Sequence, residues 1–148
     1  MRNTNWKFVP VILLMTAFAC ANPTSPAASP SPTRTDPPTD LATARDAWAA
    51  ANVGSYALQI KTQCFCALQD YRVVIGDDGS VQKAAPEDYL PETVDDLFSS
   101  IQAGYDENAA EVRVTYSEIG VPLDVFIDQS RTMADEEIGY KVAFEDVS

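Results

Sequence analysis

The sequence predicts an α+β domain in which an antiparallel sheet of about five to six strands has two helices packed on one face. Three observations support this fold. Several short segments alternate apolar and polar residues, as half-buried strands do, and two longer segments repeat apolar residues at helical spacing. The segments follow one another in the order α-β-β-β-α-β-β-β, which favours helices gathered on one side of an antiparallel sheet.

The first half of the domain is predicted to hold one helix and three strands. Asp40 can cap a helix over residues 41–52. A second strand over residues 71–75 and a third beginning near Ser80 are separated by the hairpin-turn sequence Asp77-Asp78-Gly79. The first strand, residues 55–66, alternates, and the side chains expected to face the core are Tyr56, Leu58, Ile60, Thr62, Cys64 and Cys66.

The second half repeats the order with one helix and three more strands. Thr93 is a suitable N-cap for a helix within residues 91–108, followed by acidic residues that the helix dipole favours. We expect Trp48 of the first helix and Val94, Leu97, Phe98, Ile101 and Tyr105 of this one to lie in the core. The strands cover residues 111–116, 123–128 and 140–144, and their expected buried residues are Val112, Val114, Tyr116, Leu123, Val125, Ile127, Tyr140, Val142 and Phe144.

Residues 1–19 have the layout of an export signal. Arg2 and Lys7 precede an apolar stretch from Phe8 to Ala19, which is shorter than the roughly 20 residues of a membrane-spanning helix. The small residues before Cys20 resemble the lipobox of bacterial lipoproteins. This resemblance implies diacylglyceryl modification of the Cys20 thiol, cleavage before it, and a lipid-anchored chain on the cell membrane or outer membrane, facing the periplasm or the cell exterior. A conventional signal peptide cut nearby, with Cys20 as a spare thiol, is the alternative.

Residues 20–40 are interpreted as a linker between the lipidated cysteine and a single domain at residues 41–148. The linker holds six of the ten prolines, mixed with Ser, Thr and Ala. Such a chain tends to extend, so it can hold the domain up to about 60 Å from its anchor. The net charge of −12 argues against nucleic-acid binding and against electrostatic attachment to an anionic membrane, so the lipid must supply the membrane contact.

The Cys64-Phe65-Cys66 sequence leaves three interpretations open. In an exported protein a structural disulfide is favoured, although residues i and i+2 of an extended strand lie about 6.5 to 7 Å apart, so a bond requires the strand to bend. A redox-active pair and a soft-metal site are the alternatives. Phe65, on the polar side of the strand, either packs under a loop or is exposed as a contact residue.

A second candidate site is the acidic sequence DQSRTMADEE. Asp128, Asp135, Glu136 and Glu137 offer the hard oxygen ligands that Ca²⁺ prefers. The EF-hand register fails, however, because Met133 stands where glycine is needed and Gly139 where the bidentate glutamate belongs. A solvated connection is therefore the favoured interpretation, and a nonstandard calcium loop the alternative.

A set of residues between Trp48 and Phe144 carries a resemblance to a known family. The set is Trp48, Tyr56, Cys64-Phe65-Cys66, Thr93-Val94-Asp95, Leu97-Phe98, Tyr116, Gly120-Val121-Pro122, Asp128 and Asp135-Glu136-Glu137. With this set, the chain resembles an uncharacterised bacterial lipoprotein family, the domain of unknown function numbered 6174. Within the set, Val121 and Glu136 depart from the family's pattern, and the resemblance implies no activity.

The sequence favours a non-catalytic protein without a cofactor. It contains no histidine, so triads built on histidine are excluded, and nothing singles out a pair of carboxylates for acid–base catalysis. We therefore expect a lipid-anchored binding or envelope-associated module with a protein or small-ligand partner. The alternative is a thiol-disulfide or soft-metal-handling protein that uses Cys64 and Cys66.

Overall fold

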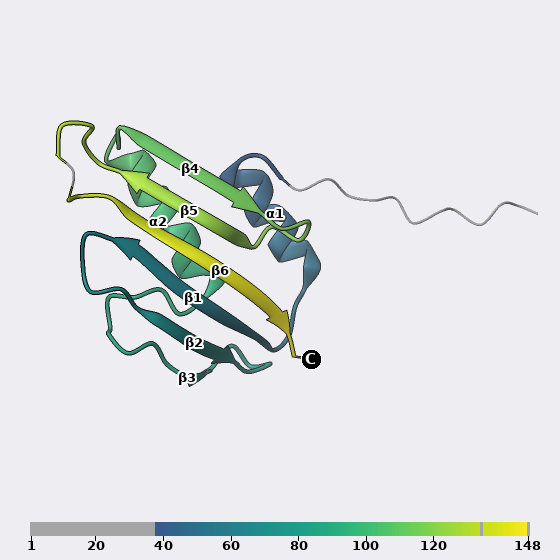
Figure 1. The fold of residues 1–148 in the computed structure, drawn as a ribbon. Coiled ribbons are helices and arrows are strands. Elements are labelled where there is room, and N and C mark those ends of the chain that lie inside the picture. The colour runs from purple at the N-terminus through teal and green to yellow at the C-terminus, as the bar shows by residue number, and fades with distance from the viewer. Residues whose placement is uncertain (1–37, 134, 148) are drawn as a thin grey trace, which may run out of the picture. The chain divides into compact units, whose positions relative to one another are not determined.

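The structure is a computed structural model and describes residues 38–133 and 135–147 (Figure 1). Its strands form one antiparallel sheet in the order β3-β2-β1-β6-β5-β4. The predicted fold class and order of elements are confirmed. The elements are α1 (Leu41–Ala51), β1 (Tyr56–Cys64), β2 (Asp70–Ile75), β3 (Val81–Lys83), α2 (Val94–Asp106), β4 (Glu111–Tyr116), β5 (Pro122–Asp128) and β6 (Ile138–Asp146).

The last strand joins the two halves of the sheet. β6 lies between β1 and β5, with Tyr56 opposite Asp146 and Cys64 opposite Ile138. Both helices lie on the same side of the sheet, behind it in the view of Figure 1. The sheet therefore has one covered face and one open face, as antiparallel sheets often do.

Both predicted helix N-caps are confirmed. The Asp40 carboxylate accepts a hydrogen bond from the backbone N–H of Thr43 at 2.9 Å and so satisfies one of the free donors at the start of α1. At α2, Thr93 and Asp96 form a reciprocal capping box. These bonds fix where each helix begins.

The core lies between the covered face of the sheet and the helices. Phe98, Leu97 and Ile101 of α2 are buried against alternate residues of the central strands. Trp48 of α1 is half-buried and packs edge-on against Tyr56, with ring centroids 5.3 Å apart. The fully buried strand residues on this face include Leu58, Ile60, Val73 and Val125.

Some expected core residues are less buried than predicted. Tyr105 was expected in the core but is 49% exposed. The neighbouring Gly104 takes the buried position, where a Cβ would lie 3.1 Å from Ile127 and 3.3 Å from Val112. A helix that approaches the sheet this closely leaves no space for a ring at that point. Four residues expected to be buried are only half-buried because they lie toward the edge or ends of the sheet: Val112, Val114, Leu123 and Phe144.

The turn between β4 and β5 packs closely on α1. Gly120 has a φ of +88°, and a Cβ there would lie 2.1 Å from the carbonyl oxygen of Ala44. Only glycine combines this left-handed backbone with such a close approach. The turn therefore holds the first helix against the covered face.

Candidate functional site

The Cys64-Phe65-Cys66 segment lies where β1 ends. The structure brings the two sulfur atoms to disulfide distance, with the Cα atoms 5.1 Å apart. The strand stops at Cys64 and the chain bends at Phe65 and Cys66. The bend that the sequence required for such a pair is therefore present.

The expectation that both cysteines face the core is wrong for Cys66. Cys64 is half-buried and Cys66 is exposed. The physical reason is the short separation: two cysteines one residue apart can approach only if the chain leaves the extended conformation, and the alternation of the strand is lost there. Cys66 consequently lies in the β1–β2 loop rather than on the covered face.

The β1–β2 loop presents apolar side chains to solvent. Phe65 is 87% exposed and Leu68 is 72% exposed. The base of the loop is closed by Thr62, a buried polar residue, whose N–H donates to the carbonyl of Gln69 at 2.9 Å and whose Oγ1 accepts from the N–H of Gln69 at 2.8 Å. Phe65 and Leu68 thus lie on a loop whose two ends are joined by the Thr62–Gln69 hydrogen bonds and whose first residues are restrained by the cysteine pair.

A hollow of about 500 Å³ lies beside this loop. Lys61 of β1 and Lys141 of β6 lie directly opposite each other on neighbouring strands and both line the hollow. Each lysine pairs outward with a carboxylate: Lys61 Nζ lies 3.0 Å from Asp70 Oδ2, and Lys141 pairs with Asp124. The two ammonium groups therefore lie between two carboxylates in one row across the open face. The remaining lining residues are Thr62, Gln63, Cys64, Leu68, Gln69 and Asp70.

The electrostatics of this row are those of a solvated surface. Hydrogen bonds from Lys61 and then from Gln59 lower the pKa of Asp70. Like charges directly opposite on neighbouring strands repel each other. An anionic group placed between Lys61 and Lys141 would relieve that repulsion, while Leu68 offers an apolar contact beside it.

The acidic residues of the alternative calcium loop are not brought together. Asp128 ends β5, is buried, and accepts a hydrogen bond from the N–H of Ser130 at 2.9 Å. Asp135, Glu136 and Glu137 are exposed in the segment before β6. Within residues 38–133 and 135–147, no three His, Cys, Asp or Glu side chains are grouped as metal ligands. The Asp128 carboxylate stabilises a turn instead.

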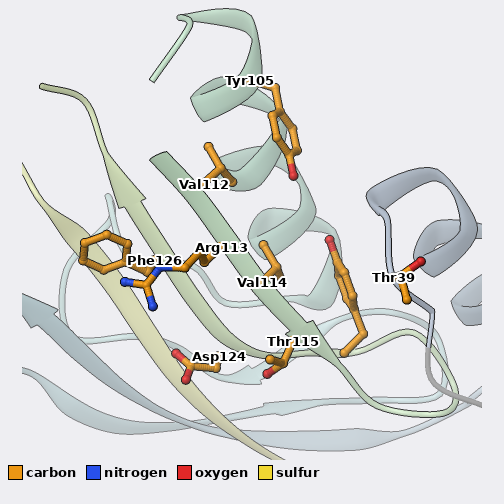
Figure 2. A pocket seen from close by; sticks show the side chains of 9 residues that line it. Thr39, Tyr105, Val112, Arg113, Val114, Thr115, Asp124 and Phe126 are labelled. Atoms are coloured by element: carbon orange, nitrogen blue, oxygen red, sulfur yellow. The ribbon is translucent and has the colours of Figure 1, made fainter. Parts of the chain in front are cut away.

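A second hollow, of about 410 Å³, follows the outer edge of β4 and was not predicted from the sequence (Figure 2). It is lined by Thr39 just before α1, by Tyr105 of α2, by β4 side chains from both faces of the strand, and by Asp124 and Phe126 of β5. The only sequence signal for it is Gly104, which lets the helix approach the sheet and leaves Tyr105 outside the core.

Cys20 and residues 20–37 of the linker lie outside the described residues. Among the residues that the structure describes, no helix is both long and apolar enough to span a membrane.

The comparisons with known proteins identify a family and no activity. The model of the "Family of unknown function (DUF6174)" matches residues 40–145. Because the match covers most of the chain, the protein belongs to this family, and the resemblance to the domain of unknown function numbered 6174 is confirmed. No curated protein and no solved structure matches the chain.

Proposed function

We propose that this member of the family is a non-catalytic, lipid-anchored binding module of the cell envelope, which contacts a protein partner through the β1–β2 loop. The observation that carries the proposal is the 87% exposure of Phe65 on a loop held by Thr62 and the cysteine pair. Large exposed apolar side chains are typical of protein-interaction surfaces. Because Thr62 and the cysteine pair restrain the backbone of the loop, less backbone entropy is lost on binding than for a free loop.

The lysine row completes the proposed contact surface. Lys61 and Lys141 lie beside the loop, in a protein whose overall charge is strongly negative. A partner that places an acidic side chain between the two lysines and an apolar pocket over Phe65 satisfies both features. Anchoring through a lipid on Cys20, with residues 20–40 as the spacer, would let the domain reach such a partner away from the membrane.

The test is site-specific photo-crosslinking in the native cells. A photoreactive amino acid replaces Phe65 in the full-length protein, and the same residue replaces Tyr89 as the control, because Tyr89 is also an exposed aromatic residue, at 77%, but lies outside the β1–β2 loop. We expect a discrete crosslinked protein from position 65 and none from position 89. Identical patterns from both positions would refute the proposed contact surface.

The anchor is tested separately. Cys20→Ser should release the protein from the membrane fraction, and mass spectrometry of the wild-type chain should find an acylated N-terminal Cys20. Phe65→Ala should remain in the membrane fraction. An unprocessed N-terminus in protein from the native cells would refute the proposed lipid anchor, and it would not bear on the proposed contact surface.

One observation favours a second candidate, a thiol-disulfide exchange protein: Cys66 is exposed, and Cys64 shares its hollow with Lys61 and Lys141. A thiolate of a partner dithiol would attack Cys66 Sγ and form a mixed disulfide. Cys64 would leave as a thiolate near two ammonium groups, and the partner's second thiol would release the reduced pair. In Cys64→Ser, the lone Cys66 thiolate would attack the disulfide of an oxidised partner, the reverse of that release, and one partner sulfur would leave as a thiolate. Because Cys64 is absent and cannot displace the partner, reductant-sensitive adducts on Cys66 should accumulate, whereas Cys66→Ser with Cys64→Ser should form none.

A further inference from the structure

The two edges of the sheet differ in how well they are protected against pairing. β3 forms one edge and has only three residues, all exposed and ending in Lys83. Short length and charge are the usual means by which proteins prevent an edge from pairing with another chain. β4 forms the other edge, has six residues without proline, and has no neighbouring strand on its outer side among the described residues.

The hollow along β4 lies at the edge of the sheet and is lined by side chains from both faces of the strand. Figure 2 shows Val112 and Val114 on the helix side of β4, below Tyr105, with Arg113 directed toward Phe126 on the other side. The two valines are only half-buried, and Tyr105 is 49% exposed. A space that contacts both faces of one edge strand fits an added extended strand, whose side chains alternate between the same two faces.

The charges of β4 complement those of a second β4 in one register. Glu111 and Arg113 share the open face of the sheet, and the Arg113 guanidinium lies 2.6 Å from the Glu111 carboxylate and 4.4 Å from the Phe126 ring centroid. In an antiparallel pair related by a two-fold axis at Val112, each Glu111 lies opposite Arg113 of the other copy. Moving the pair along by two residues places Arg113 opposite Arg113, where like charges repel.

We propose that the protein self-associates through the β4 edge, so that two copies form one continuous antiparallel sheet about a two-fold axis at Val112. In this register Val112 faces Val112 of the other copy on the helix side and Val114 faces Ala110, while the two Glu111–Arg113 pairs place opposite charges across the open face. The β1–β2 loop joins strands on the other half of the sheet, so the dimer leaves the proposed partner surface free.

Charge-exchange variants of the full-length protein, released from detergent micelles, test this dimer by native mass spectrometry. Glu111→Arg alone and Arg113→Glu alone each place like charges opposite each other at both facing positions, and each should weaken self-association by at least about tenfold. An equimolar mixture of the two variants restores opposite charges at both positions. It should form a heterodimer with an affinity close to that of the wild type.

The control is Asp77→Arg, which changes the net charge as much as Glu111→Arg but at an exposed turn residue away from β4. It should leave the dimer unchanged. A wild-type protein that is monomeric at all concentrations, single variants that dimerise as the wild type does, or a mixture that forms no heterodimer would each overturn the proposal. Crosslinking from Phe65 is measured independently, so failure of the dimer leaves the proposed partner contact standing.

Discussion

The two faces of the sheet are built from alternate residues of the same strands, yet they have opposite physical character. On the covered face, Leu58 and Ile60 of β1 have no exposed surface. On the open face, Gln59 and Lys61 of the same strand carry polar groups that both pair with Asp70 of the neighbouring strand β2. Successive residues of one strand thus serve two different environments.

The difference indicates where stability resides and where sequence is free to serve function. Removal of apolar surface from water on the covered face supplies most of the free energy of folding. The open face is held by exposed ion pairs such as Lys61–Asp70 and Arg72–Glu145, which contribute little in water. Changes on the open face and the β1–β2 loop should therefore alter binding without unfolding the domain.

The largest expected effect comes from adjacent residues on opposite faces of β1. Leu58→Ala should lower the free energy of unfolding by about 2 to 5 kcal/mol, because it leaves a cavity in the buried core. Gln59→Ala should cost less than about 1 kcal/mol, since it removes only an exposed hydrogen bond to Asp70. Urea unfolding of both variants measures the difference. Equal losses would contradict the division between the faces.

A smaller effect on the free energy of unfolding is expected when the hydroxyl groups of two tyrosines of the covered face are removed. The hydroxyl of Tyr71 donates to the carbonyl of Pro91 at 2.9 Å, whereas the buried hydroxyl of Tyr116 has no partner among the described residues. Tyr71→Phe should lower the free energy of unfolding by about 1 to 2 kcal/mol, because the Pro91 carbonyl loses its donor. Tyr116→Phe should be neutral or stabilising. A loss at Tyr116 as large as that at Tyr71 would show that its hydroxyl is satisfied in solution.

The same tyrosines predict how the covered face responds to alkali. Burial raises the pKa of Tyr116 to about 12 and also raises the pKa of Tyr71 above its ordinary value of 10. Above pH 10 the unfolded chain loses these protons while the folded chain keeps them, so stability is complete below pH 10 and falls as the pH rises toward 12. Tyr116→Phe should make this fall shallower in urea titrations at pH 9 to 12. An unchanged slope would argue against the burial of that hydroxyl.

Local patterns were sufficient to predict most of the fold. Asp40 and Thr93 were predicted as caps because capping depends on residues within one turn, and both bonds are present. The alternation in β1 correctly separated its two faces as far as Cys64. The position of β6 between β1 and β5 was not predictable, because it depends on pairing between residues about 80 positions apart.

Several features of the candidate sites were not predictable from local patterns, because they depend on the bend at the cysteine pair and on tertiary packing. The exposure of Cys66 follows from the bend that brings it to Cys64, which an alternating pattern does not reveal. Tyr105 continued the apolar face of its helix in sequence, but the contact of Gly104 with Ile127 excludes it from the core. Lys141 joins Lys61 in one hollow only through the β1–β6 register. The last two features are contacts between residues far apart in the chain, which a single sequence does not specify.

The smallest expected effect tests the open face itself. Arg72 Nη2 lies 2.6 Å from Glu145 Oε2, and both side chains are substantially exposed. A double-mutant cycle with Arg72→Ala and Glu145→Ala should give a coupling energy of about 0.2 to 1 kcal/mol, decreasing as salt is added, because water and ions screen the pair. A coupling above about 2 kcal/mol that persists in high salt would mean that the open face contributes to folding as the covered face does. A weak coupling would mean that substitutions at Lys61, at Lys141 and in the β1–β2 loop can test binding without changing the free energy of unfolding.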